Sequence, residues 1–263
     1  MIDGRDPFRI WRVIDDGAGE AAWNMGMDEA LLNAIVTNIS PPSVRLYSWL
    51  RPSISLGRFQ NIDRTLFLEN CIRRDIPLVR RITGGRGILH GDDLTVCIAV
   101  PITALDMGDN PSIVSIYTKL AAGFLAAFHE LRIEAIVGDR RDERVRSIQG
   151  DCFATISRAD IVDASTGRKL LGSALHRRGN SILQQISIPL HSPERYREWH
   201  EISQCIFQGS RGLPEYSPVA SIDSSDMREA IVIGLKSALG IESENMKFTD
   251  AEWLLATELA RTH

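Results

Sequence analysis

A run rich in arginine and glycine carries the residue types best suited to binding a ligand. It reads Arg-Arg-Ile-Thr-Gly-Gly-Arg-Gly-Ile-Leu-His over residues 80–90. Glycine lets a backbone approach a ligand and turn its N–H groups toward an anion, and arginine neutralises phosphate or carboxylate. On these residues alone, the alternative is a tight connection between strands beside solvated arginines. The candidate substrate-binding residues here are Arg80, Arg81, Thr83, Gly84, Gly85, Arg86, Gly87, Ile88, Leu89 and His90.

The second candidate is a catalytic pair, Cys152 and Lys169. Cys152 follows a polar, charged segment at residues 138–151, and Lys169 stands at the start of a later extended run. Two neighbouring strands can bring such side chains together, and an ammonium beside a thiol favours the thiolate, the nucleophilic form of cysteine. The spacing alone is more typical of an inert buried cysteine and of a surface lysine at a strand end.

A third candidate is the run of small residues Gly172, Ser173 and Ala174 inside an expected strand. Small side chains in mid-strand leave room for a ligand or for another backbone to approach. A β-bulge explains the same run equally well. We therefore treat the three residues as candidate substrate-binding positions.

The remaining cysteines and acidic residues suggest structural roles. Cys71 and Cys97 stand in apolar runs, where cysteine usually serves as a small core residue. Asp92 and Asp93 are interpreted as a charged turn. The cysteines and histidines show neither metal-ligand nor catalytic-triad spacing, so no metal site is expected.

The elements that must position these residues follow from hydrophobic spacing. Gly179-Asn180 between two extended runs predicts a hairpin, and Thr249 with Glu252 predicts a capping box. Residues 138–151 are expected to form either a solvated connector or a mobile active-site lid. Helices are expected at residues 23–36, 62–74, 111–131, 224–239 and 249–262, and extended segments at 44–50, 53–57, 78–82, 88–90, 93–100, 159–163, 169–178 and 181–190. This mixture predicts an α+β fold with a mixed, largely antiparallel β-sheet flanked by helices, in a single domain over residues 1–263.

Composition excludes several classes of protein. Of the 263 residues, 44% are hydrophobic and 24% are charged, which is ordinary for a soluble globular protein. A net charge of -4 argues against binding nucleic acid through bulk electrostatics. No apolar run is long enough for a transmembrane span, and the N-terminal residues lack the apolar region of a signal peptide. We therefore expect no membrane association and a cytoplasmic location.

Six ordered segments, taken together, resemble the lipoate–protein ligase and octanoyltransferase family. They are WRVIDDG, NMGMDEALL, SISLGRFQN, VRRITGGRGILHGDDLT, GRKLLGSALHRRGNSILQQISI and FTDAEWLLATELA, and they extend from about Ile10 to Ala260. The resemblance implies the fold shared with biotin–protein ligases, a mixed β-sheet flanked by helices. It also implies attachment of an eight-carbon acyl group to one lysine of a small lipoyl carrier domain.

Two details resemble the cysteine-dependent octanoyltransferases more than the ATP-dependent ligases. Arg86 stands where the ligases usually have the third of three glycines, and Cys152-Phe153 stands where many of them have Asn-Asp. Two departures from the family pattern are also present. Gly87 replaces an alanine, and the usual Gln-His-Gly-Ser run of the hairpin reads Gln184-Gln185-Ile186-Ser187, which affects the expected acyl site.

The resemblance implies a mechanism without a cofactor. Cys152 takes the octanoyl group from acyl carrier protein as a thioester and passes it to a lipoyl carrier, such as glycine cleavage H protein or a 2-oxoacid dehydrogenase E2-like domain. Lys169 favours the thiolate and holds the acyl carbonyl, while backbone N–H groups of the glycine run and of residues 172–174 stabilise the oxyanion. Ile88 and Leu170 are the expected contacts of the acyl tail. Arg80, Arg81 and Arg86 are expected to steer acidic carriers or, in a ligase, to contact a nucleotide phosphate.

Three other functions remain open on the sequence. The first is an ATP- and Mg-dependent lipoate or octanoate ligase that uses Lys169 and Arg81, with Cys152 incidental. The second is an amidotransferase that moves octanoyl between lipoyl proteins by the same cysteine route. The third is a non-catalytic protein that binds lipoyl carriers, which the altered hairpin run favours and the presence of both Cys152 and Lys169 opposes.

Overall fold

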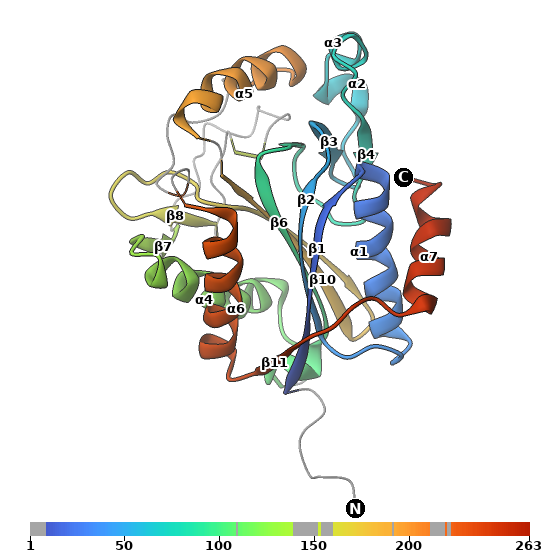
Figure 1. The fold of residues 1–263 in the computed structure, drawn as a ribbon, viewed down its shortest axis with the longest axis vertical. Coiled ribbons are helices and arrows are strands. Elements are labelled where there is room, and N and C mark those ends of the chain that lie inside the picture. Colours follow the sequence, from blue (N-terminus) through green and yellow to red (C-terminus); the bar gives the residue numbers. More distant parts are fainter. Residues whose placement is uncertain are drawn as a thin grey trace, which may run out of the picture.

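A mixed β-sheet forms the centre of the computed structural model, which describes residues 9–108, 110–138, 152–153, 160–190, 192–210, 219 and 222–263. In those residues the sheet has six strands in the order β11-β1-β2-β6-β10-β9 (Figure 1). Strand β1 pairs in parallel with β2 and β11, and the other neighbours are antiparallel. The α+β fold expected from the sequence is therefore confirmed. The strands are β1 (Ile10–Gly19), β2 (Ser43–Trp49), β6 (Asp93–Pro101), β9 (Gly172–Arg178), β10 (Ser181–Pro189) and β11 (Glu242–Asn245).

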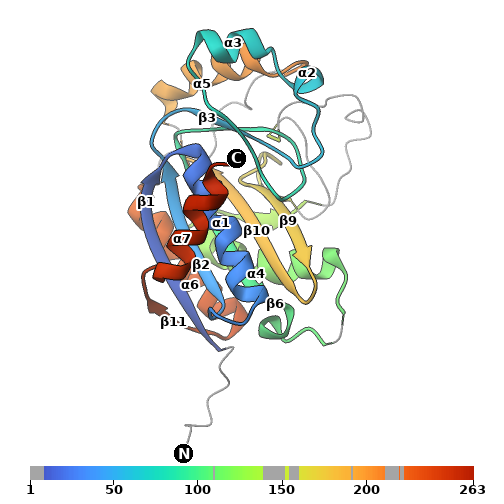
Figure 2. The same cartoon turned by 90° about the vertical axis from the view of Figure 1, so that its right-hand side faces the viewer.

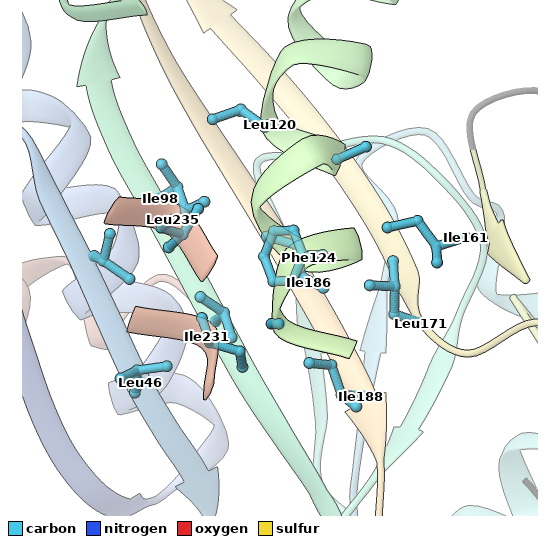
Figure 3. Close-up of a cluster of buried hydrophobic side chains, with 14 of the residues drawn as sticks. Leu46, Ile98, Leu120, Phe124, Ile161, Leu171, Ile186, Ile188, Ile231 and Leu235 are labelled. Atoms are coloured by element: carbon cyan, nitrogen blue, oxygen red, sulfur yellow. The ribbon is translucent and has the colours of Figure 1, made fainter. Parts of the chain in front are cut away.

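Helices cover both faces of this sheet. Helices α4 (Ile113–Glu130) and α6 (Ser224–Leu239) lie on one face, and α1 (Ala21–Val36) and α7 (Asp250–Ala260) lie on the other (Figure 1). Alternation along the strands supplies both layers, because successive side chains of a strand point to opposite faces. Figure 3 shows the larger core, in which Ile98 and Ile186 of the sheet pack with Phe124 of α4 and Leu235 of α6. Cys97 is fully buried on the α1 face, as expected of a core cysteine.

A smaller layer lies beyond one end of the large sheet. It contains β3 (Ser53–Leu56), β4 (Leu78–Arg80) and β5 (Ile88–His90), in the order β4-β3-β5. Helices α2 (Ile62–Thr65), α3 (Leu68–Arg73) and α5 (Pro193–Ile206) lie at the same end (Figure 2). Elsewhere β7 (Ala135–Val137) pairs with β8 (Ile161–Asp163), and a 3-10 helix spans Ile102–Leu105. Cys71 of α3 is buried, again as expected.

The prediction of a single helix at residues 62–74 is wrong, because two short helices, α2 and α3, occupy that segment. Leu66 leaves the helical path and forms an antiparallel bridge with Phe207, and the N–H of Phe67 donates to the carbonyl oxygen of Ile206. Leu66 is also almost completely buried. Pairing with a distant part of the chain therefore overrides the helical spacing here.

Turn and capping residues define the β9–β10 hairpin and the start of helix α7, as expected from the sequence. Gly179, with a φ of 60°, forms the expected β9–β10 turn with Asn180. Thr249 and Glu252 form a reciprocal capping box at the start of α7, and buried Glu252 also pairs with Arg12 of β1 at 2.6 Å. This ion pair joins α7 to the sheet. Residues 139–151 lie outside the described residues, so the connector and lid interpretations of that segment stay predictions.

Among the described residues, none of the helices has the length and apolar character needed to span a lipid bilayer.

Helices α4 and α6 approach closely because glycine occurs on both sides of their contact. A Cβ on Gly234 of α6 would overlap the carbonyl oxygen of Gly123 and lie 2.6 Å from the backbone nitrogen of Ala127. A Cβ on Gly123 would lie 2.5 Å from the Leu235 side chain. The contact therefore tolerates no added methyl group unless the helices move apart.

We expect Gly234→Ala to lower the free energy of unfolding by about 1–2 kcal/mol. The cost of overpacking a filled core, about 1–3 kcal/mol, exceeds the gain of about 1 kcal/mol that alanine brings to a helix interior. Urea denaturation measures the difference, and Ser237→Ala on the exposed side of the same helix is the control. Equal stability of Gly234→Ala and the wild type would contradict the close helix contact.

Candidate active site

The glycine run between β4 and β5 is folded around the side chain of Arg81. Its Nη1 donates to the carbonyl oxygen and to Oγ of Ser55, both at 2.7 Å. Its Nη2 donates to the carbonyl oxygens of Gly84 at 3.0 Å and Arg86 at 2.9 Å, and its Nε donates to Thr83 Oγ1 at 3.3 Å. All five guanidinium N–H groups are therefore used, two by Ser55 of β3 and three by the loop itself. The expectation that Arg81 steers carriers or contacts a phosphate is wrong, because the side chain is buried and holds the loop instead.

The charge of Arg81 has no carboxylate partner in the described part of the chain, since all its acceptors are neutral oxygens. Burial lowers the pKa of Arg81 to about 10, although the nearby Cys152 thiolate opposes that effect. A group with this pKa remains a cation at neutral pH. The loop therefore places a buried positive charge beside the cysteine.

Cys152 and Lys169 meet as expected, but no strand carries the cysteine. Cys152 is held to the glycine run by its N–H, which donates to the carbonyl oxygen of Gly87 at 2.9 Å. Lys169 lies just before β9 and bridges to Val162 of β8. The Lys169 Nζ lies 3.5 Å from the Cys152 Sγ and 3.3 Å from the Cys152 carbonyl oxygen. The thiol and the ammonium are thus in direct contact.

Asp160 is the third member of this cluster, and the sequence analysis missed it. One carboxylate oxygen lies 2.9 Å from the Lys169 Nζ, and both side chains are nearly inaccessible to solvent. The ammonium has three N–H donors, and it has three acceptors in Asp160 and the two Cys152 atoms. Burial favours the neutral amine, but the charges of Cys152 and Asp160 outweigh it and raise the pKa of Lys169.

A largely apolar cavity opens beside the cluster, and its open space of about 350 Å³ includes solvent at its mouth. It crosses the strands of the large sheet, because Gly172 of β9, Ser187 of β10, Thr95 of β6 and Tyr47 of β2 follow one another in register. A Cβ on Gly172 would lie 3.1 Å from the Cys152 Sγ, so the cavity begins at the thiol. It is lined by Met25, Tyr47, Trp49, Arg81, Gly85, Arg86, Ile88, His90, Thr95, Cys152, Ser173, Ala174, Gln185, Ile186 and Ser187.

The polar side chains at the cavity wall are hydrogen-bonded to one another. The Asp93 carboxylate accepts from His90 Nδ1 at 2.8 Å, Thr95 Oγ1 at 3.0 Å and Ser187 Oγ at 2.7 Å. Asp93 is therefore a buried anchor, and its interpretation as part of a charged turn is wrong. Burial raises the pKa of Asp93, but the charge of His90 and the hydrogen bonds from His90, Ser187 and the Gly91 N–H outweigh burial and lower that pKa. A ligand here meets mostly apolar surface.

The altered hairpin run keeps its links to the rest of the site. Gln185 donates from Nε2 to Asp28 Oδ2 at 2.7 Å and accepts from Thr83 Oγ1 at 2.7 Å. It thereby connects α1 to the glycine run. The side chain of Ile186 packs in the core with Phe124 on the opposite face of the sheet (Figure 3).

The structure brings together only part of the residue set expected from the sequence. Leu170 is wrong as an acyl contact, because its side chain is buried in the core cluster that contains α4 and α6. Arg80 does not line the cavity and instead donates to backbone oxygens of residues 57–60. Cavity residues include Arg81, Gly85, Arg86, Ile88, His90, Cys152, Ser173 and Ala174, with Lys169 and Gly172 beside Cys152, whereas Thr83, Gly84, Gly87 and Leu89 lie in the surrounding structure.

Two kinds of site residue were missed, some that line the cavity and one that contacts Lys169. Met25, Tyr47, Trp49 and Thr95 are placed by strand register and helix docking, which a single sequence does not specify. Asp160 had a weak signal, as a carboxylate in the short extended segment that precedes the Lys169 run. Groups of three or more His, Cys, Asp or Glu side chains positioned to hold a metal ion do not occur within the described residues.

Comparisons with known proteins agree with this geometry. Residues 20–228 match the family model for the lipoyl protein ligase A/B catalytic domain. A protein of Halalkalibacterium halodurans named octanoyltransferase LipM is 30% identical, over 97% of this chain and 96% of its own length. A protein of the same name from Moorella thermoacetica is 37% identical, over 70% of this chain and 66% of its own length.

Solved structures show the same fold at low sequence identity. A bi-partite lipoate protein ligase from Thermoplasma acidophilum superposes with a TM-score of 0.76 at 17% identity, covering 96% of this chain and 92% of that one. A lipoate-protein ligase A structure bound with ATP gives a TM-score of 0.75 at 18% identity, covering 96% and 94%. The family match spans most of the chain and two curated relatives reach 30% identity or more. This chain belongs to the lipoyl protein ligase A/B catalytic domain family.

Proposed function

We propose that this chain is an octanoyltransferase, which moves an octanoyl group from acyl carrier protein to the acceptor lysine of a lipoyl carrier domain through a thioester on Cys152. The observation that carries the proposal is the contact of 3.5 Å between Cys152 Sγ and Lys169 Nζ where the apolar cavity begins. The relatives named octanoyltransferase LipM support the acyl group and the reaction type.

The cavity suits an eight-carbon tail. It crosses from β9 to β2 over three strand spacings, which is about 14 Å at the usual separation of neighbouring strands. An extended octanoyl chain is about 9 Å long, given carbon–carbon bonds near 1.5 Å. The tail can therefore lie across β10 and β6 with its carbonyl at the cysteine, while Ile88 and Trp49 supply apolar contacts.

In the first step the Cys152 thiolate attacks the carbonyl carbon of the donor thioester. A new carbon–sulfur bond forms, the bond to the donor sulfur breaks, and the departing donor thiolate takes up a proton from water. The Lys169 ammonium and the Arg81 guanidinium provide positive charge beside the oxyanion. Backbone N–H groups of the glycine run and of residues 172–174 are the proposed hydrogen-bond donors to that oxygen.

In the second step the neutral amine of the acceptor lysine attacks the Cys152 thioester. The amide carbon–nitrogen bond forms and the carbon–sulfur bond breaks, so Cys152 leaves as a thiolate paired with Lys169. The extra proton on nitrogen passes to water. Conversion of a thioester to an amide is downhill, so the reaction needs no ATP.

Asp160 acts in this scheme as a positioning residue for Lys169. Its carboxylate takes one of the three ammonium N–H groups, which leaves the other two directed at Cys152. Its charge also keeps Lys169 protonated after the thiolate has been converted to a neutral thioester. Without Asp160, the buried ammonium would then have no anionic partner within salt-bridge distance among the described residues.

We expect wild-type protein incubated with octanoyl acyl carrier protein and no ATP to gain one octanoyl group, which hydroxylamine removes. Cys152→Ala and Cys152→Ser gain no hydroxylamine-sensitive group, because neither can form a thioester. Intact-protein mass spectrometry measures the adduct. The proposal would be refuted if the wild type gained no adduct but modified a lipoyl domain when free octanoate or lipoate was supplied with ATP and Mg. The chain would then be a ligase.

We expect Asp160→Asn to slow thioester formation about tenfold or more and to move the alkaline limb of its pH profile to lower pH. Asp160 raises the pKa of Lys169, so activity that needs the ammonium is lost as pH rises through that pKa. Removing the carboxylate lowers that pKa and brings the loss to lower pH. Rapid-quench measurement across pH tests this, with Asp160→Glu expected to restore much of the rate. An unmoved alkaline limb would exclude the positioning role.

A further inference from the structure

A rigid turn at residues 57–60 presents two side chains to solvent. The N–H of Gln60 donates to the carbonyl oxygen of Gly57 at 3.0 Å, and the Gly57 N–H donates back to Gln60 Oε1 at 2.9 Å. The Arg58 N–H donates to the carbonyl oxygen of Thr83 at 2.8 Å, which ties the turn to the glycine run. Arg58 and Phe59 therefore stand at the tip of a turn that is closed on itself and anchored.

The Arg80 side chain adds a second anchor. Its Nη1 donates to the carbonyl oxygens of Gly57 and Gln60, both at 2.9 Å, and to that of Arg58 at 3.3 Å. A guanidinium that satisfies several carbonyl oxygens of one turn fixes its backbone without any contribution from the tip side chains. The tip residues are therefore not needed to hold the turn together.

Phe59 is the most exposed large apolar side chain among the described residues, at 86%. A mobile aromatic residue would lose much conformational freedom on binding, but this one stands on a fixed backbone, so less is lost. The Arg58 guanidinium carbon lies 5.6 Å from the centre of the Phe59 ring. Adjacent aromatic and arginine side chains are the types most enriched at the energetic centres of protein interfaces.

The turn forms part of the rim of the acyl cavity. A Cβ on Gly57 would overlap the carbonyl oxygen of Gly85, so the two backbones are in direct contact. Gly85 is itself exposed and lines the cavity that also contains Cys152. A protein that presents a side chain to Cys152 at this rim therefore approaches Arg58 and Phe59.

The charge of the turn is positive in a chain of net charge -4. In the part of the chain that the structure describes, neither Arg58 nor Arg80 pairs with a carboxylate. The pKa of His176 on β9 is lowered mainly by burial, and the positive charges of Arg178 and Arg58 lower it further. Glu29, whose charge also reaches His176, is paired with Arg178 and His263. An acidic partner surface is therefore complementary to the turn.

The length of a lysine side chain indicates that the acceptor, and not the donor, must contact this rim. The distance from Cα to Nζ of an extended lysine is about 6 Å, from carbon–carbon bonds near 1.5 Å. To attack a thioester on Cys152, the acceptor must bring its own surface to the cavity opening. A donor that carries its acyl group on a longer prosthetic arm can deliver it from further away.

We propose that the turn Gly57–Gln60 is the docking element for the acceptor, a small acidic domain that presents its lysine to Cys152, with Phe59 as the apolar anchor and Arg58 as the charged one. The assignment rests on the proposed function, since it assumes a thioester on Cys152.

The test separates the two half reactions. Acyl-enzyme is first formed from octanoyl acyl carrier protein and quantified by intact mass, and the isolated acyl-enzyme is then mixed with increasing concentrations of an apo lipoyl domain. For Phe59→Ser and Arg58→Glu we expect acyl-enzyme formation within about twofold of wild type. The acceptor concentration for half-maximal transfer should rise about tenfold or more, the effect of removing an interface anchor. The matched control is Ile72→Ser, because Ile72 is 71% exposed on α3 and should leave both steps unchanged.

Each outcome decides the assignment. Unchanged acceptor dependence in both variants would overturn it. Slower acyl-enzyme formation with normal transfer would make the turn a donor site and would overturn it as well. A wild type that forms no acyl-enzyme removes the proposed function, and the docking assignment falls with it. Melting temperatures of the two variants equal to that of the wild type show that the losses do not arise from unfolding.

Discussion

The Arg81 guanidinium joins two parts of the site that are separate in the sequence, strand β3 and the glycine run. It binds the backbone and side chain of Ser55 in β3, two carbonyl oxygens of the glycine run and the hydroxyl of Thr83. Burying a cation is costly, and five hydrogen bonds of the charge-assisted kind offset that cost. Lysine would supply at most three donors and no planar fork, so it could not hold the same set of oxygens. The path of the glycine run, and with it one wall of the cavity, depends on this one side chain.

Buried polar contacts extend from Arg81 to both layers of the protein. Through Thr83 and Gln185 they reach Asp28 of α1, which pairs with Arg45 at 2.8 Å. Such a network is stable only when its members are satisfied. Gln185 meets that condition with one donor and one acceptor directed at its two neighbours. This explains how the hairpin tolerates glutamine where the family usually has histidine, and the Ile186 side chain faces the core on the opposite side of the sheet. Neither departure removes the cavity.

Local sequence patterns predicted most of the helices and strands, because turns, caps and hydrophobic spacing depend on residues that are close together in the chain. The extended runs on either side of Gly179-Asn180 predicted β9 and β10, and the capping signal of Thr249 and Glu252 placed the start of α7. The helix at residues 62–74 failed because Leu66 pairs with Phe207, a partner that no local pattern reveals. The same limit applies to the cavity, whose width depends on the register of four strands. Residue chemistry suggested the Cys152–Lys169 pair and the family resemblance favoured it over an inert cysteine, whereas the contact of Asp160 with Lys169 emerged only from the structure.

The charges around the partly buried Cys152 can balance the negative charge that a thiolate carries in the proposed reaction. Arg81 and Lys169 contribute two positive charges and Asp160 contributes one negative charge. With a neutral thiol the cluster carries an excess positive charge, and with a thiolate it is balanced. After acylation the sulfur is neutral again and the excess returns, which favours the oxyanion of the second step. Because Arg81 has no carboxylate partner among the described residues, the same residue that shapes the glycine run also supplies the charge that the chemistry requires.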